Sequence, residues 1–111
     1  MHIEVSTDTR TTVDVGSVTA EVETGLSRHR ERLTRVAVYL SDVNGPKGGT
    51  DCRCALEARP AGRQPVAVTS EAASPDEAVS ESVEKMDRLL ASTFERLDDR
   101  KGGTSASGQP S

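Results

Sequence analysis

Aromatic residues are scarce in this sequence, which limits the kind of core it can form. Of 111 residues only 2% are aromatic, with no tryptophan, one tyrosine and one phenylalanine. A hydrophobic core must therefore be built from valine, leucine, alanine and cysteine. A chain of this length fits one domain and buries roughly 60–65% of the surface that its unfolded form exposes. We expect one modest core and no second one.

Long apolar runs and a cysteine framework are also missing. No hydrophobic stretch approaches the roughly 18 residues of a membrane-spanning helix, and the start, MHIEVSTDTR, lacks the basic and apolar regions of a secretory signal. Cys52 and Cys54 are the two cysteines, and neighbours at this spacing rarely pair with each other. We therefore expect a soluble cytoplasmic protein with free thiols.

Charge is distributed unevenly along the chain. The net charge is −4, made up of −4 over residues 1–27, +3 over residues 28–35 (RHRERLTR), −3 over residues 76–101 and zero elsewhere. An acidic total argues against a generally basic nucleic-acid binder, so any such surface must be local. The basic run can also be read as a solvated helix end, where cations complement the helix dipole.

The first third of the chain predicts a strand followed by a helix. Ile3 and Val5 alternate with polar residues, as in a short strand. An apolar stripe with helical spacing then consists of Val18, Val22, Leu26, His29 and Leu33. Either Asp14 or Ser17 is a suitable N-cap. Gly25 lies inside the stripe, where glycine costs about 1 kcal/mol relative to alanine. The basic run falls at the end of this helix, and His29 is expected to be partly buried where the helix meets the sheet.

Three strands are predicted in the middle of the chain. Residues 34–42, TRVAVYLSD, and 51–59, DCRCALEAR, both alternate along their length, and Val66 and Val68 mark a further strand. Short connections between the three predict an antiparallel meander. The first strand reaches this meander through a helix, so it should pair with its neighbour in parallel.

The last helix has the clearest local signal. Residues 74–77, SPDE, form a capping box with proline at the first helical position, and the helix should run to about Arg100. The Gly/Ser-rich end reads as a flexible tail, which gives a domain over residues 1–101 and a tail over 102–111. The element order is β-α-β-β-β-α. The predicted fold class is α+β, with one four-stranded mixed sheet and two helices packed on one of its faces.

Residues 41–54, SDVNGPKGGTDCRC, allow three interpretations. Asparagine, proline and glycines favour a hairpin loop between two strands. A phosphate-binding loop would lead into a helix N-terminus, whereas here a strand follows. A ligand-contacting loop with Lys47 at its tip remains the third possibility.

The two cysteines do not fit a metal site. Tetrahedral zinc needs about two further ligands, and His2 and His29 have no motif spacing to the cysteines. Cys52 and Cys54 share a face with Leu56, which predicts that they belong to the core. The sequence also has no nucleophile elbow or histidine-containing acid/base motif. We expect no enzyme, no cofactor and no metal.

Taken together, the element order, the turn SDVNGPKGG and the ending ASPDEAVSESVEKMDRLL resemble the ribosome hibernation family, which includes hibernation-promoting factor and ribosome-associated inhibitor A. The resemblance covers roughly residues 1–100 and, because a tail follows, points to a short form. It implies a factor that binds the small ribosomal subunit and its rRNA near the decoding site in stress. Such a factor inhibits translation by occluding mRNA and tRNA, without chemistry, membrane, DNA or small-molecule substrate.

The resemblance also implies an RNA-binding site of basic residues on the exposed faces of the two helices. Matching positions in this sequence are Arg28, Arg30, Arg32, Lys85 and Arg88. Arginine and lysine suit rRNA phosphates because they release counterions and arginine binds phosphate bidentately. The family usually continues with basic residues after the last of these, whereas residues 89–93 here are LLAST and acids follow. An alternative is therefore a protein-interaction or stress-adaptor domain with this fold and little rRNA affinity. The RNA-binding interpretation requires that these side chains converge on one outer surface, clear of the acids.

Overall fold

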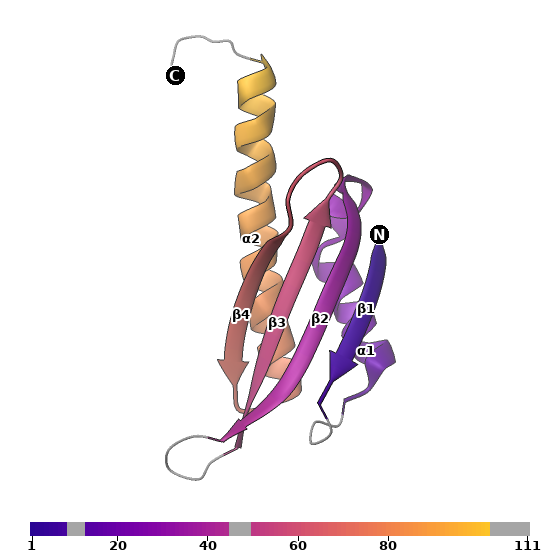
Figure 1. The fold of residues 1–111 in the computed structure, drawn as a ribbon, viewed down its shortest axis with the longest axis vertical. Helices are drawn as coiled ribbons and strands as arrows, with labels where there is room; N and C mark the ends of the chain where they lie inside the picture. The colour runs from indigo at the N-terminus through magenta and orange to yellow at the C-terminus, as the bar shows by residue number, and fades with distance from the viewer. Residues whose placement is uncertain (9–12, 45–49, 103–111) are drawn as a thin grey trace.

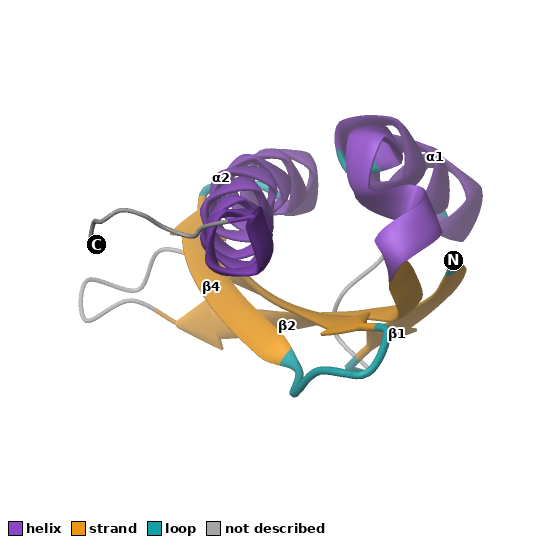
Figure 2. Ribbon diagram, turned by 90° about the horizontal axis from the view of Figure 1, so that it is seen from above, coloured by secondary structure: helices purple, strands orange, loops and turns teal. Residues whose placement is uncertain are grey.

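The fold is a four-stranded sheet with both helices on one face. The computed structural model describes residues 1–8, 13–44 and 50–102. Its elements are β1 (His2–Thr7), α1 (Val15–Gly25), the 3₁₀ helix η1 (Ser27–Arg32), β2 (Leu33–Asn44), β3 (Thr50–Pro60), β4 (Val66–Ala72) and α2 (Pro75–Gly102). The strand order is β1-β2-β3-β4, with β1 parallel to β2 and the other pairs antiparallel. Figures 1 and 2 show the helices side by side over one face. The predicted α+β fold is confirmed.

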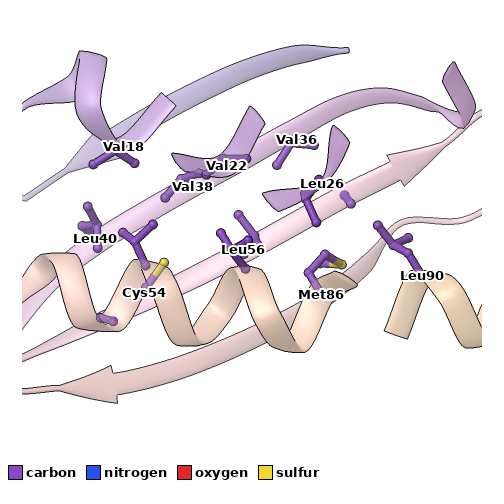
Figure 3. Packing of buried hydrophobic residues seen from close by; sticks show 14 of the residues in the cluster. Val18, Val22, Leu26, Val36, Val38, Leu40, Cys54, Leu56, Met86 and Leu90 are labelled. Carbon is purple, nitrogen blue, oxygen red and sulfur yellow. The ribbon is translucent and has the colours of Figure 1, made fainter. Parts of the chain in front are cut away.

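The core lies between this face of the sheet and the two helices. Alternate residues of the central strands, such as Val38 and Leu56, meet Val22 from α1 and Met86 from α2, and all are essentially inaccessible to solvent (Figure 3). This arrangement follows from the period of two in the strands and the one-sided apolar stripes of the helices. Aliphatic side chains and cysteines therefore fill the core, as the shortage of aromatics requires.

Both cysteines belong to this core. Cys52 and Cys54 are free and buried, with 6% and 0% of their surfaces exposed, which confirms the prediction. Burial is the main cause that raises the pKa of the Cys54 thiol; a hydrogen bond with Ser82 partly offsets it, and the carboxylate of Glu21 raises the pKa further. Within the described part of the chain, no group of three potential metal ligands comes together.

Helix α1 is shorter than the apolar stripe predicts. Asp14 is its N-cap and accepts hydrogen bonds from Gly16 N and from Ser17 Oγ, so Ser17 supports the cap and is not itself the cap. The helix ends at Gly25, which corrects the prediction that the stripe continues to His29 and Leu33 on one helix. His29 lies in η1, and Leu33 begins β2.

The correction has a simple geometric reason. A 3₁₀ helix has three residues per turn, so residues three apart lie on the same side. Leu26 and His29 are three apart and both point inward, with 0% and 5% exposure. The same spacing also fits an α-helix, and periodicity alone therefore does not distinguish the two forms.

Gly25 is required by the packing of α1 against α2. A Cβ atom built on this residue would lie 2.1 Å from Cγ1 of Val83. Since this is far below van der Waals contact, the two helices can approach this closely only with glycine at this position. From the sequence alone, Gly25 is expected only to weaken the helix.

Helix α2 begins as the capping box predicts. Ser74 Oγ accepts a hydrogen bond from the backbone N–H of Glu77 at 3.3 Å. The helix extends to Gly102, slightly beyond the predicted end at Arg100. Apart from Gly102, the predicted tail over residues 102–111 lies outside the described residues. No helix in the described ranges is long and apolar enough to cross a membrane.

Strands β2 and β3 form the predicted hairpin. Their antiparallel register extends from Leu33↔Pro60 to Asn44↔Thr50. Residues 45–49, which include Lys47, lie outside the described residues, so the structure does not test the interpretation of Lys47 as a ligand contact.

Candidate nucleic-acid interface

The turn η1 carries three of the predicted site residues and is anchored to α2 by His29. The His29 side chain is buried, and its Nε2 lies 2.9 Å from Oδ1 of Asp87. Its ring centre is 5.6 Å from that of Phe94. His29 was predicted to be partly buried where the first helix meets the sheet. It is instead almost fully buried, and its polar contact is with α2. This contact holds η1 and its arginines in a defined position.

Arg28 contributes to the same anchor. Its Nε and Nη2 donate to the two carboxylate oxygens of Asp87, both at 2.9 Å. This bidentate pair is the main cause that holds the pKa of Asp87 below its usual range, and the contact with His29 lowers it further. The guanidinium of Arg28 is exposed but already has an anionic partner, so its first role is to position η1.

Arg30 and Arg32 are the exposed arginines at the C-terminal end of the turn. Arg30 Nη2 lies 3.7 Å from Oε2 of Glu23, and both side chains are about half exposed. An exposed ion pair of this kind is worth little and exchanges readily for another anion. The guanidinium carbon of Arg32 lies 4.1 Å from the centre of the Phe94 ring, a cation–π contact that orients it at the surface.

Lys85 and Arg88 lie away from this turn. Lys85 Nζ donates to the backbone carbonyl of Thr69 at 2.8 Å, so Lys85 lies on the flank of α2 that faces β4. Asp87, the partner of Arg28, is two residues further along, which is about 200° around the helix. Arg88 is exposed and forms no ion pair with any residue that the structure describes. The structure therefore groups the three arginines of η1 but does not bring Lys85 to them.

Two arginines outside the predicted site lie beside η1. The backbone N–H of Ala61 donates to the carbonyl of Arg32 at 2.9 Å, and Thr34 Oγ1 donates to the carbonyl of Arg59 at 3.0 Å. These bonds hold the turn between β3 and β4 against η1 at one end of the sheet (Figure 1). Arg59 and Arg63 are exposed there, with Arg59 on the face of the sheet opposite the helices because it alternates with the buried Ala58.

We call the set Arg30, Arg32, Arg59 and Arg63 the basic end. Within the described ranges, neither Arg59 nor Arg63 forms an ion pair. The predicted hairpin already indicated this grouping, because antiparallel pairing places the end of β3, with Arg59, beside the start of β2, which follows Arg32.

The outer surface of α2 has the opposite sign. Arg88 lies among exposed glutamates that follow the same side of the helix, namely Glu77, Glu81, Glu84 and Glu95. Phosphates would be repelled along most of this surface. The predicted site residues therefore fall into two electrostatic environments, a cationic one at η1 and a mainly anionic one on α2.

The fold, a four-stranded α+β sheet covered on one face by two helices, is also found in solved structures of other proteins. No protein-family model and no curated protein sequence matches the chain. Among solved structures, a ribosomal subunit interface protein from Coxiella burnetii shares 15% identity, with 86% of this chain and 99% of that chain covered and a TM-score of 0.65. The N-terminal domain of Protein Y from Thermus thermophilus shares 18% identity, with 84% and 99% covered and a TM-score of 0.63. These likenesses confirm the fold that the family resemblance implied.

Proposed function

We propose that this protein is a cytoplasmic ribosome-associated factor that binds the small subunit near the decoding site. It inhibits translation by occupying the path of mRNA and tRNA, and it uses no chemistry. The observation that carries the proposal is the basic end, where two separate segments present four arginines on a fold shared with a ribosomal subunit interface protein. Occlusion requires only affinity and shape, and this small rigid domain can supply both.

The basic end suits rRNA for physical reasons. Guanidinium groups bind phosphate bidentately and release counterions from the RNA. A folded rRNA surface is recognised largely by shape and backbone, so few base-reading side chains are needed. Arg30 and Arg32 make the principal phosphate contacts, and Arg28 positions them. Lys85 and Arg88 are secondary contacts, reached only by phosphates that pass along α2.

Co-sedimentation with ribosomes and with separated subunits tests this function, at low and at moderate salt. We expect salt-sensitive pelleting with the small subunit, and its loss in the double variant Arg30→Glu/Arg32→Glu. The double variant Lys85→Glu/Arg88→Glu changes the net charge equally and should have a smaller effect. Circular dichroism checks that both variants remain folded. No pelleting of the unaltered protein at low salt would refute the proposal.

A second candidate is a protein-interaction domain with the same fold and little rRNA affinity. The acidic outer surface of α2 favours it, because this surface opposes nucleic acid. If the unaltered protein does not pellet with ribosomes, this second function becomes the better supported one.

A further inference from the structure

Helices α1 and α2 form a groove on the side of the molecule away from the sheet. The two helices run beside each other over the sheet (Figure 2), and the groove between them has a volume of about 500 Å³. Ala20 and Thr24 from α1 and Ser80 from α2 line it, with Val83 at its floor. Small side chains on both helices leave this space open, and the floor is largely apolar.

The rim of the groove carries two carboxylates on opposite helices. Glu21 lies on α1 and Glu84 on α2, and both line the groove. Neither makes an ion pair or a hydrogen bond with a residue in the described part of the chain. Two arginines of η1 have other acidic partners, since Arg28 binds Asp87 and Arg30 lies near Glu23.

We propose that this groove docks a lysine- or arginine-rich segment of a protein partner. An aliphatic side chain of the segment enters between Ala20 and Ser80, and a cation of the segment lies between Glu21 and Glu84. The choice of partner follows from charge complementarity, because two carboxylates that form no ion pair within the described ranges attract a cation and repel phosphate.

The chemistry of basic side chains fits both parts of the groove. Lysine and arginine have long aliphatic stems that cover apolar surface while the charged head stays in water. A helix that lays one face along a groove is a common mode of peptide recognition. The basic end lies outside this groove, so this inference does not depend on ribosome binding.

The test uses a fluorescently labelled helical peptide with one face of leucine and alanine and the other of lysine, titrated with the protein at low and at physiological salt. We expect binding, and about tenfold weaker binding to the double variant Glu21→Gln/Glu84→Gln. The matched control Glu81→Gln/Glu95→Gln removes the same charge from the outer surface of α2 and should bind nearly as well as the unaltered protein. Ala20→Trp should weaken binding by filling the groove.

Mapping by NMR distinguishes docking in the groove from general attraction. Amide shifts at Ala20, Thr24 and Ser80 on addition of the peptide would support the proposal. Absence of binding at low salt, equal weakening by both double variants, or shifts confined to other surfaces would overturn it. Ribosome pelleting by the Glu21→Gln/Glu84→Gln variant should be unchanged, so a failure of this inference is separable from a failure of the proposed function.

Discussion

Replacing Gly25 by alanine should destabilise the protein, although alanine is the better helix former. The added Cβ would lie 2.1 Å from Cγ1 of Val83, whereas Cβ of Val83 would be at an ordinary 3.5 Å, so the clash is with the Cγ1 methyl group alone. Valine has one strongly preferred rotamer in a helix, so the methyl group cannot simply rotate aside. Either Val83 adopts a poor rotamer or α1 moves away from α2.

The magnitude follows from two opposing effects. Overpacking of a tight contact costs about 1–3 kcal/mol. Alanine in place of glycine stabilises a helix interior by up to about 1 kcal/mol through its higher helix propensity, and the final residue of α1 by less. The expected net loss is about 1–2 kcal/mol, and each kcal/mol lowers the melting temperature of a domain this size by about 4–8 °C.

Thermal unfolding followed by circular dichroism measures this change, with Gly16→Ala as the matched control. The Cβ of that control would meet Asp14 Oδ1 at 3.4 Å, an ordinary contact, so no loss of stability is expected. In a Val83→Ala background the Gly25→Ala change should become neutral or favourable, which a double-mutant cycle detects. An increase in stability with Gly25→Ala alone would refute the close approach of the helices.

Three further predictions concern the core, the anchor of η1 and the basic end. Cys54→Ser should lower the free energy of unfolding by about 1–3 kcal/mol because it places a hydroxyl in an apolar layer. An unchanged free energy of unfolding in a urea titration would show that Cys54 does not belong to the core. The pKa of Asp87 is lower in the folded protein than its ordinary value of 3.8, so the charge of Asp87 stabilises the fold at pH values above 3.8. This contribution is lost as the pH falls through the lower pKa of the folded state. Asp87→Asn should therefore be less stable than the unaltered protein at neutral pH, with the difference shrinking in acid; a constant difference across a pH series of urea titrations would contradict this origin. Arg59→Glu/Arg63→Glu should reduce ribosome pelleting, but less than Arg30→Glu/Arg32→Glu, and full retention of pelleting would exclude the β3–β4 turn from the interface.

The strands and α2 were predictable because their signals are local. Residues 34–42 and 51–59 alternate without interruption, and a buried sheet face selects such a pattern directly. The capping box at residues 74–77 starts α2 with its own side chains, so that boundary did not depend on the rest of the fold. The end of α1 was not predictable in the same way, because the spacing of Leu26 and His29 fits two kinds of helix.

The candidate site was only partly predictable. The arginines of η1 are consecutive in sequence and were found by their charge. Their partners were not, since the pairing of Arg28 with Asp87 depends on how η1 packs against α2. Lys85 matched a helix motif, yet the position of α2 on the sheet directs it to the carbonyl of Thr69.

By itself, the sequence determined the order of the elements, the faces of the strands and the burial of both cysteines, since these depend on periodicity within a few residues. Only the tertiary structure decided the surfaces that can bind a partner. Antiparallel pairing brings Arg59 and Arg63 beside Arg32, and close packing at Gly25 aligns Glu21 with Glu84 across a groove. Contacts between residues distant in sequence create both surfaces; the predicted hairpin indicated the first of them, whereas no local pattern specifies how α1 packs against α2.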